Sequence, residues 1–376
     1  MQEKFFCPYR ICPIGAHSDH QGGLTTGFAI DKGIEIEYTK TADGKIKLES
    51  REFGKTKEFS IGKYPEREND WADYLRGVVV FLEKKYPLSY GVDGLIKGSL
   101  PIGGLSSSAA LCLSFLGALC NANDIKLTER ELIDTAFLAE TQYVGVRVGK
   151  LDQSCEVLSK KDHLLYLDNK DATYSLIEKK PNMKPFEIAI FFSGVERTLV
   201  GSKFNMRVDE LKSASYALKA YAGMEYGKFQ DTVLRDVPYE VFKEHREKLP
   251  ENWRKRAEHY YSEFERVKKG VAAWENGDIE AYGKCSFESG YSSIYNFETG
   301  SDELKKLYEI MLETDGIYGG RFSGAGFKGC CAAIINPEYK EEITYRITKE
   351  YLKEFPMLEN KFSVHFCNTS DGVNFR

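Results

Sequence analysis

Hydrophobic and polar residues form two kinds of pattern in the first half of this chain, one typical of strands and one typical of helices. Stretches rich in β-branched residues predict strands at Gly33–Thr39, Ile46–Glu49 and Val92–Gly98. The segment from Thr128 to Glu131 fits a capping box, and the apolar residues after it recur at helical spacing. The first half therefore predicts short strands combined with two helices, of which the second, after Thr128, is the better marked.

The second half is rich in helical patterns between about Leu211 and Thr314. Strand patterns return at Cys330–Ile335 and near Lys361–His365. Strands and helices are mixed without regular βαβ alternation, which favours two α+β domains. We expect the boundary near Lys180-Pro181-Asn182, which gives an N-terminal domain of residues 1–181 and a C-terminal domain of residues 182–376.

Composition excludes several classes of protein. The chain has 376 residues, 42% hydrophobic and 29% charged, as soluble globular proteins do. The net charge of −5 and the lack of long Lys/Arg clusters predict no nucleic-acid partner. The longest apolar stretch, Ala109–Cys120, is too short to span a membrane. The nine scattered cysteines contain no C-x-x-C pair, so we expect reduced thiols and a cytoplasmic protein.

A glycine- and serine-rich loop joins a predicted strand to a predicted helix at Pro101–Ala109. Glycines allow close approach of the backbone to a ligand, and the start of a helix favours an anion. This arrangement indicates a phosphate site, and an ordinary helix cap with spare serines is the alternative. A Walker-type P-loop is excluded at Gly54-Lys55-Thr56, because Glu49 stands where that motif requires glycine.

A second glycine cluster begins at Ser323 and includes Gly324, Gly326 and Gly329. These glycines match G-x-G-x-x-G, but a strand pattern follows where a dinucleotide-binding fold requires a helix. A tight loop lining a ligand is the favoured interpretation, with a plain β-turn as the alternative.

Two acidic residues in the first half are candidates for chemistry. Glu140 continues the apolar stripe of Ile133, Ala136 and Phe137, so its carboxylate should face inward. A buried carboxylate requires a partner, which can be an ion pair or Mg²⁺. Twelve residues later, Asp152 is a lone acid in a partly apolar segment, and on its own it fits a solvated turn as well as a base.

Polar groups gather between glycines in the segment from Arg10 to Gly23. His17, Asp19 and His20 are possible metal ligands in this segment. Neighbouring loop residues rarely converge on one ion without a further ligand, so hydrogen bonding to a polyol is at least as good an interpretation.

Taken together, these segments resemble the galactokinase branch of the GHMP kinase superfamily over nearly the whole chain. The segment from Arg10 to Gly23 resembles that branch's sugar signature, G-E-H-T-D-Y-N-x-G. The loop Pro101–Ala109 is similar to the phosphate motif P-x-G-x-G-L-S-S-S-A, with one residue missing. The segment Ser323–Cys330 resembles the third motif, T-G-G-G-F-G-G-C. Further matches are Ala139-Glu140, Asp152-Gln153, Trp71-Ala-Asp-Tyr74 and Arg256-Ala-Glu-His259.

The resemblance implies a two-lobed α+β kinase that uses ATP and Mg²⁺ in a cleft between its lobes. It implies that Asp152 is the catalytic base and that Arg10 is its cationic neighbour. The implied sugar contacts are Arg10, Ala16, His17, Asp19, Gly149, Asp152 and Phe204. The implied nucleotide contacts are Trp71, against the adenine, and Gly103, Gly104, Leu105, Ser106, Ser107, Ser108 and Ala109. Ser107 or Ser108 would hold Mg²⁺ together with Glu140, and Ser323, Gly324, Gly326 and Gly329 would form the third-motif loop.

Three departures from the family pattern bear on the substrate. Ala16 replaces the glutamate that contacts the C6 hydroxyl of the sugar, Phe204 replaces a tyrosine, and Lys328 replaces a glycine. Loss of a carboxylate beside C6 favours a sugar acid, so we expect a D-galacturonate 1-kinase. Galactose is the alternative substrate, and a catalytically silent sugar sensor is the alternative of another class. Lys150, Arg147 and Lys328 are candidates to meet a C6 carboxylate, and we expect a monomer or a weak homo-oligomer.

Overall fold

A computed structural model describes residues 2–52, 54–62, 67–195 and 201–374 of the chain. The chain divides into two compact units. Unit 1 consists of Met1–Arg10, Ala29–Lys161 and Ser370–Arg376, and unit 2 of Ile11–Phe28 and Asp162–Thr369. The chain therefore passes from the longest segment of unit 1 to the longest segment of unit 2 at residues 161/162. The domain boundary expected at residues 181/182 stays a prediction.

Unit 1 contains a sheet in which the strand order is β4-β3-β5-β2, with β1 paired to β2. The strands are β1 (Glu3–Ile11), β2 (Leu24–Thr41), β3 (Lys45–Ser50), β4 (Lys55–Ser60) and β5 (Gly91–Gly98). Strand β2 pairs with β5 in antiparallel register from Ile34↔Gly98 to Thr41↔Gly91. Ile34, Ile36 and Tyr38 are buried while the glutamates between them are less so, because successive side chains of a strand point to opposite faces of the sheet.

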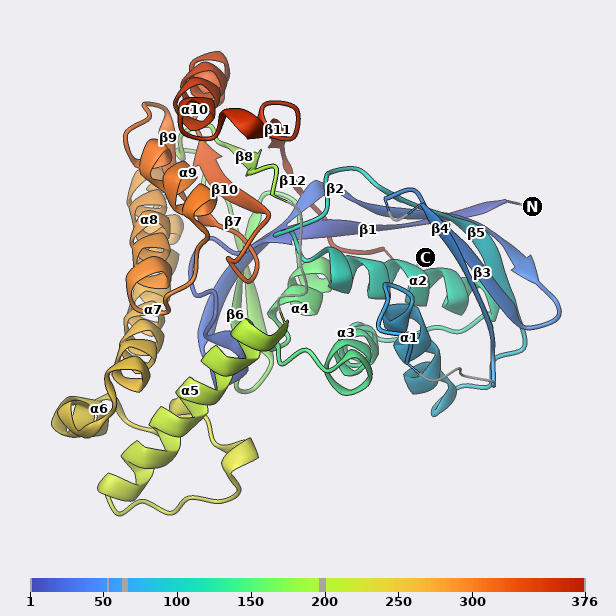
Figure 1. Cartoon of the computed structure of the whole chain (residues 1–376), viewed down its shortest axis with the longest axis horizontal. Coiled ribbons are helices and arrows are strands. Elements are labelled where there is room, and N and C mark those ends of the chain that lie inside the picture. Colours follow the sequence, from blue (N-terminus) through green and yellow to red (C-terminus); the bar gives the residue numbers. More distant parts are fainter. Residues whose placement is uncertain (1, 53, 63–66, 196–200, 375–376) are drawn as a thin grey trace. The chain divides into compact units, whose positions relative to one another are not determined.

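The helices of unit 1 lie together on one side of these strands (Figure 1). They are α1 (Asp73–Glu83), α2 (Ser107–Ala122), α3 (Glu129–Leu138), the π-helix η2 (Ala139–Val144) and α4 (Leu151–Leu158). Helix α2 is apolar on every side and almost entirely buried. The predicted capping box of α3 is confirmed, because Thr128 accepts from the Glu131 backbone and Glu131 reaches back to Thr128.

Unit 2 contains β6 (His163–Asp168) and β7 (Thr173–Glu178), and β6 pairs with the first residues of β2 from Leu24↔Asp168 to Gly27↔Leu165. A separate antiparallel sheet has the strand order β11-β8-β10-β9. Its strands are β8 (Glu187–Phe192), β9 (Ile317–Phe322), β10 (Cys330–Ile335) and β11 (Ser363–Cys367). The short strand β12 (Thr369–Ser370) lies where the chain leaves unit 2.

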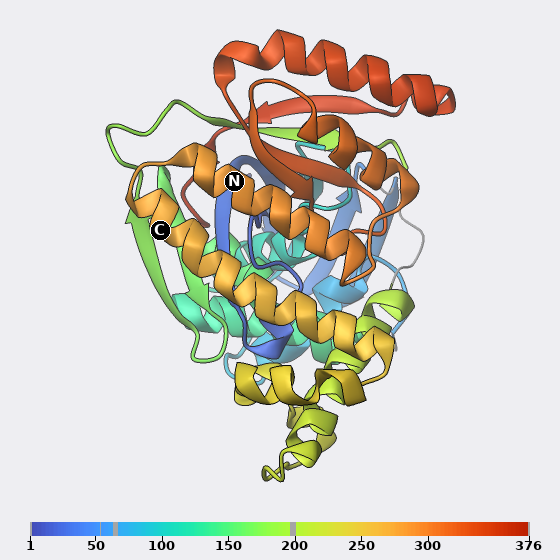
Figure 2. The ribbon, with the colours of Figure 1, turned by 90° about the vertical axis from the view of Figure 1, so that its left-hand side faces the viewer.

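The helices of unit 2 are α5 (Gly201–Tyr221), α6 (Tyr239–His245), α7 (Glu251–Glu275), α8 (Ile279–Tyr295), α9 (Asp302–Leu312) and α10 (Lys340–Glu354). Helices α7 and α8 run side by side (Figure 2). Buried residues of α9 and α10, among them Leu307, Met311 and Ile347, pack with Phe191 and Cys331 of the sheet. The predicted α+β class is confirmed, and no helix of the described residues is both long and apolar enough to cross a membrane.

Candidate functional site

Arg10 and Asp152 form a close ion pair within unit 1. The Arg10 Nε–H donates to Asp152 Oδ1 at 2.7 Å, and Arg10 Nη1 lies 3.5 Å from the Gly104 carbonyl oxygen. Arg10 ends the unit 1 part of β1 and is buried, whereas Asp152 lies in the first turn of α4 with 22% of its side chain exposed. The cation is fixed and the carboxylate stays accessible, an arrangement suited to a base that works on a bound ligand.

The loop before α2 has the backbone geometry of an anion site. Gly103 and Gly104 have φ values of 134° and 85°, and Ser106 adopts the left-handed conformation with φ of 58°. Ser106 occupies the cap position of α2 but makes no side-chain cap hydrogen bond. Its buried Oγ has no hydrogen-bond partner among the described residues. The alternative of an ordinary serine cap is therefore not supported, and the free N–H groups of α2 can accept an anion.

Other members of the predicted phosphate loop are placed differently. Ser107 and Ser108 begin α2 and are half-buried, so a ligand can reach them. Leu105 and Ala109 are buried, with exposed fractions of 1% and 0%, and contribute packing under the loop.

Two further residues of the predicted site lie outside this loop. Gly149 is buried just before α4, and Trp71 is buried just before α1.

Glu140 is buried, as the apolar stripe predicts, with 3% of its surface exposed. It lies in the π-helix η2, and Gln153 Nε2 donates to Glu140 Oε2. The π-helix locally widens the turn after Leu138, a distortion frequent at functional sites. Gln153, which directly follows Asp152 in the sequence, thus forms a hydrogen bond to the carboxylate of Glu140.

Unit 1 contains oxygen groups of the kind that Mg²⁺ prefers. This ion is usually bound by one or two protein oxygens while phosphate oxygens and waters fill its remaining positions. Glu140 offers a carboxylate that accepts from Gln153, and Ser107 and Ser108 offer hydroxyls at the start of α2. In the described ranges no three potential metal-ligating side chains of His, Cys, Asp or Glu gather at one point.

Apart from Arg10, the sugar-signature segment lies in unit 2, where His17 has a defined tautomer. His17 Nε2 lies 2.9 Å from the Gly324 carbonyl oxygen, which can only accept, so Nε2 carries the proton. The ring stacks on Phe297 with centroids 4.6 Å apart. Burial, with a smaller effect of Arg321, lowers the pKa of His17 well below its usual range, so the ring is neutral. Nδ1 has no partner among the described residues and is an acceptor for a donor such as a sugar hydroxyl.

Phe204 lies beside the same loop, as the resemblance implies. Its ring centroid is 6.1 Å from that of His17 and 5.9 Å from that of His20. Ala16 is buried, and Asp19 begins the 3₁₀ turn η1 (Asp19–Gln21) and is half-buried. Burial lowers the pKa of His20 to about 3. The metal alternative for this segment has no support in the described part of the chain, where no ligand cluster is found.

The third-motif loop joins β9 to β10 as the turn of an antiparallel hairpin. Gly324, Gly326 and Gly329 have φ values of 70°, 77° and 106°. A Cβ on Gly326 would lie 2.2 Å from the Phe322 ring, so this position requires glycine. The strand after the loop confirms that the motif is not a dinucleotide fingerprint. Its contact with His17 brings the first and third motifs together.

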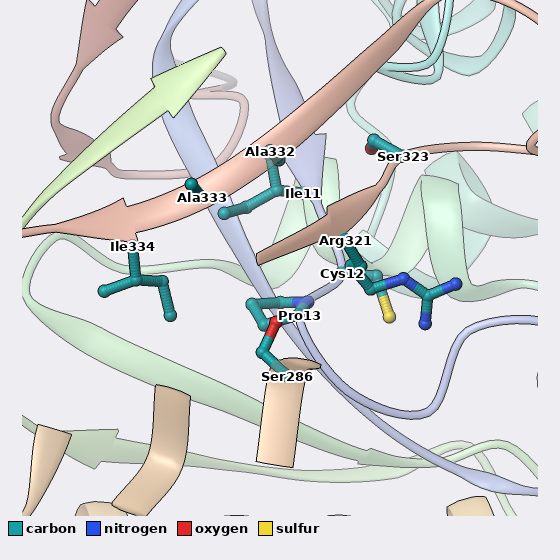
Figure 3. Close-up of a pocket in the computed structure, with 9 residues that line it drawn as sticks. All are labelled: Ile11, Cys12, Pro13, Ser286, Arg321, Ser323, Ala332, Ala333 and Ile334. Atoms are coloured by element: carbon teal, nitrogen blue, oxygen red, sulfur yellow. The ribbon is translucent and has the colours of Figure 1, made fainter. Parts of the chain in front are cut away.

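A cavity of about 10 Å³ lies behind this loop (Figure 3). It is lined by Ile11, Cys12, Pro13, Ser286, Arg321, Ser323 and residues 332–334. This volume holds about one water molecule and is too small for a sugar or a nucleotide.

Sequence reasoning missed two buried acids next to these groups. Glu156 lies one helical turn after Asp152, is fully buried, and neither carboxylate oxygen has a hydrogen-bond partner among the described residues. Burial, reinforced by Asp152, raises the pKa of Glu156 far above its usual range, so it is a neutral acid. Glu263, on α7, accepts a hydrogen bond from the Gly15 backbone. The signal available in the sequence was helical spacing, because Glu156 is four residues after Asp152 and Glu263 is four residues after His259.

Comparison with known proteins agrees with these features. Residues 73–160 match the model of the GHMP kinases N terminal domain, and residues 268–353 match that of the GHMP kinases C terminal domain. The chain is 37% identical over 391 residues to the galacturonokinase of Arabidopsis thaliana, covering 97% of this chain and 92% of that protein. It is 31% identical to the galactokinase of Roseiflexus sp. (strain RS-1), covering 97% of this chain and 91% of that one.

A solved structure is similar over the full length. The galactokinase of Lactococcus lactis complexed with galactose has a TM-score of 0.89 and 27% sequence identity, covering 100% of this chain and 95% of that one. The mevalonate kinase of Methanococcus jannaschii shares the fold, with a TM-score of 0.64 and 16% identity. The chain belongs to the galactokinase branch of the GHMP kinase superfamily.

Proposed function

We propose that this protein is an ATP- and Mg²⁺-dependent kinase that phosphorylates the anomeric hydroxyl of D-galacturonate. The hydrogen-bonded pair of Arg10 and Asp152 supports catalysis, because a sensor without activity has no need of an accessible base held by a buried cation. The identity of 37% to a galacturonokinase supports the sugar acid.

In the proposed reaction Asp152 accepts the proton of the C1 hydroxyl. The C1 oxygen forms a bond to the γ-phosphorus of ATP, and the bond from that phosphorus to the β–γ bridging oxygen breaks, so ADP leaves. Arg10 orients the carboxylate of Asp152 through Nε. The start of α2, with Ser106, receives the phosphates. Glu140 and Ser107 or Ser108 would hold Mg²⁺, which supplies neutralisation of phosphate charge.

The sugar side of the proposal rests on residues 16, 17 and 204. His17 offers Nδ1 as an acceptor to a sugar hydroxyl, and the apolar ring of Phe204 lies beside the His17 ring. Ala16 leaves out the carboxylate of the family signature. Two carboxylates about 4 Å apart repel by about 4 kcal/mol at an effective dielectric near 20. This energy corresponds to roughly a thousandfold in affinity.

Galactose is the second candidate substrate. The likeness to a galactokinase solved with galactose, with a TM-score of 0.89, favours it. The first experiment is a screen of ATP consumption with galacturonate, glucuronate, galactose and other hexoses. A preference for galacturonate supports the proposal, and equal or better turnover of galactose assigns the protein as a galactokinase. No turnover of any sugar would favour the sensor.

The substrate assignment is tested by Ala16→Glu with Ala16→Gln as its matched control. The two side chains have nearly the same volume, so any difference between them reports charge. We expect Ala16→Glu to lower kcat/KM for galacturonate far more than Ala16→Gln does, and to raise the relative preference for galactose. Equal effects of both variants on the ratio of kcat/KM for the two sugars would mean that residue 16 does not face C6.

The nine cysteines support a cytoplasmic location in this proposal. None of them forms a disulfide in the part of the chain that the structure describes, and eight are buried while Cys285 is half-buried. Reduced thiols are typical of the cytosol.

A further inference from the structure

Backbone groups of two consecutive residues in the sugar-signature loop, Gly15 and Ala16, form hydrogen bonds to side chains on one face of α7. The Gly15 N–H donates to Glu263 Oε2 at 2.6 Å, and the Ala16 carbonyl accepts from His259 Nε2 at 3.0 Å. His259 and Glu263 are four positions apart on α7, so both side chains point to the same side of the helix. Both are completely buried, with exposed fractions of 0%.

Helix α8 provides a serine for each of these side chains. Ser289 Oγ donates to Glu263 Oε2 at 2.8 Å, and Ser292 Oγ lies 2.9 Å from His259 Nδ1. Because Nε2 of His259 must donate to a carbonyl, Nδ1 of the neutral ring accepts from Ser292. Each α7 side chain therefore lies between an α8 serine and a backbone group of the loop.

The charges of this arrangement are fixed by its surroundings. Burial lowers the pKa of His259 to about 4, so the ring is neutral near pH 7 and keeps one proton on Nε2. Burial alone would raise the pKa of Glu263, but Arg266 and the other polar groups around the carboxylate together outweigh it, and the pKa lies below its usual range. Arg321 Nη1 donates to Ser289 Oγ at 2.5 Å and completes the chain of hydrogen bonds.

The loop is also closely packed around Gly15. Gly15 has φ of 95°, and a Cβ there would lie 2.4 Å from the Leu24 carbonyl oxygen and 2.9 Å from Val267 Cγ2. Ser18 Oγ donates to the Gly15 carbonyl at 2.7 Å. The backbone at residues 15 and 16 is thus held both by close packing and by buried hydrogen bonds.

We propose that His259 and Glu263 are positioning residues for sugar binding, because they fix the direction in which the side chains of residues 16 and 17 leave the loop. This inference rests on the proposed function for the identity of the ligand. His17 presents its Nδ1, and Ala16 its small side chain, from a backbone that cannot shift toward or away from the sugar. Neither His259 nor Glu263 needs to touch the ligand.

The test compares His259→Ala with His259→Gln and with a control on the same helix, Trp274→Phe. Gln offers an amide donor that can replace Nε2–H toward Ala16. Trp274 is fully buried and donates its Nε1–H to the Ile177 carbonyl at 2.9 Å, so the control also loses a buried hydrogen bond to a backbone carbonyl. KM for galacturonate, KM for ATP, kcat and the thermal midpoint are measured for each variant.

We expect His259→Ala to raise KM for the sugar at least tenfold while KM for ATP changes less than twofold. His259→Gln should restore most of the sugar affinity, and Trp274→Phe should leave both KM values within twofold. An unchanged sugar KM in His259→Ala, with a thermal midpoint lowered as in the control, would overturn the proposal. If His259→Ala does not fold, Ser292→Ala takes its place, with an expected three- to tenfold rise in KM for the sugar, and no rise would overturn the proposal.

Hydrogen exchange separates this proposal from the proposed function. Amides of residues 14–18 should exchange at least tenfold faster in Glu263→Gln and His259→Ala than in wild type, and at the wild-type rate in Trp274→Phe. This result is expected even if the wild type phosphorylates none of the sugars screened, in which case the substrate assignment alone fails. Wild-type exchange in both α7 variants would show that they do not hold the loop.

Discussion

Asp152 accepts a 2.7 Å hydrogen bond from Nε of Arg10, which lies 142 residues earlier in the chain. Only 4% of the Arg10 side chain is exposed, against 22% of the Asp152 side chain. The arginine is a fixed part of unit 1, whereas the aspartate has one oxygen anchored and an accessible surface. This asymmetry is what a positioned base requires.

Asp152→Asn is expected to lower turnover by roughly 10²–10⁴, the usual contribution of a general base, and to leave ATP binding nearly unchanged. Its matched control is Asp168→Asn, because the Asp168 side chain is 21% exposed and pairs with Arg235 at 2.6 Å. Steady-state kinetics and nucleotide binding are measured for both variants. Turnover in Asp152→Asn that equals the control would remove Asp152 from the mechanism.

Glu140→Gln is expected to raise the Mg²⁺ concentration needed for half-maximal activity, while sugar binding without nucleotide changes little. The substitution removes the charge but can keep a hydrogen bond to Gln153. Glu131→Gln, on the neighbouring helix α3, is the control and should keep the wild-type metal requirement. A variant that is less stable but has the wild-type Mg²⁺ dependence would identify Glu140 as a purely structural residue.

Glu156→Gln is expected to stabilise the protein increasingly as the pH rises from 5 to 8. Burial raises the pKa of Glu156 in the folded state, so the folded protein keeps a proton that the unfolded chain releases above its ordinary pKa. Wild-type stability attributable to this group therefore falls with rising pH, and an amide of the same shape avoids the loss. The thermal midpoints of wild type and variant are compared across this range.

The control for this pH effect has the opposite sign. The backbone and hydroxyl of Thr128 and the hydroxyl of Tyr86 lower the pKa of Glu131, so Glu131 contributes stability above its ordinary pKa. Glu131→Gln should therefore lose stability relative to wild type as the pH rises to that value, and its midpoint difference from wild type should stay constant from pH 5 to 8. Parallel midpoint curves for wild type and Glu156→Gln would show that Glu156 is ionised in the folded protein.

Local signals in the sequence predict local structure correctly here. The capping box of Thr128 and Glu131 is formed by residues three apart, and the burial of Glu140 follows from neighbours within two turns. The strand predicted near Lys361–His365 begins at Ser363 instead, because the Lys361 and Phe362 backbones bond to Leu358 in a turn. The predicted strand Gly33–Thr39 is one part of β2, which extends from Leu24 to Thr41.

Such local patterns cannot predict contacts between segments that are far apart in the sequence. Periodicity cannot pair Arg10 with Asp152, and the family resemblance alone placed them together. The Gly15 N–H and its acceptor Glu263 are 248 residues apart, and nothing near either residue marks the other. Glu156 was missed because a glutamate in an apolar helix is usually assigned to an exposed face.

The separation between the sugar-signature loop and its support on α7 and α8 has a consequence for biosynthesis. Residues 11–28 leave the ribosome before residues 259–292, which provide the groups that hold Gly15 and Ala16. At about 5–20 residues per second this delay is roughly 12–55 s. In the later part of that time the nascent chain contains the phosphate loop and Asp152 but still lacks the side chains that hold Gly15 and Ala16. The ability to recognise the sugar is therefore among the last properties the growing chain acquires.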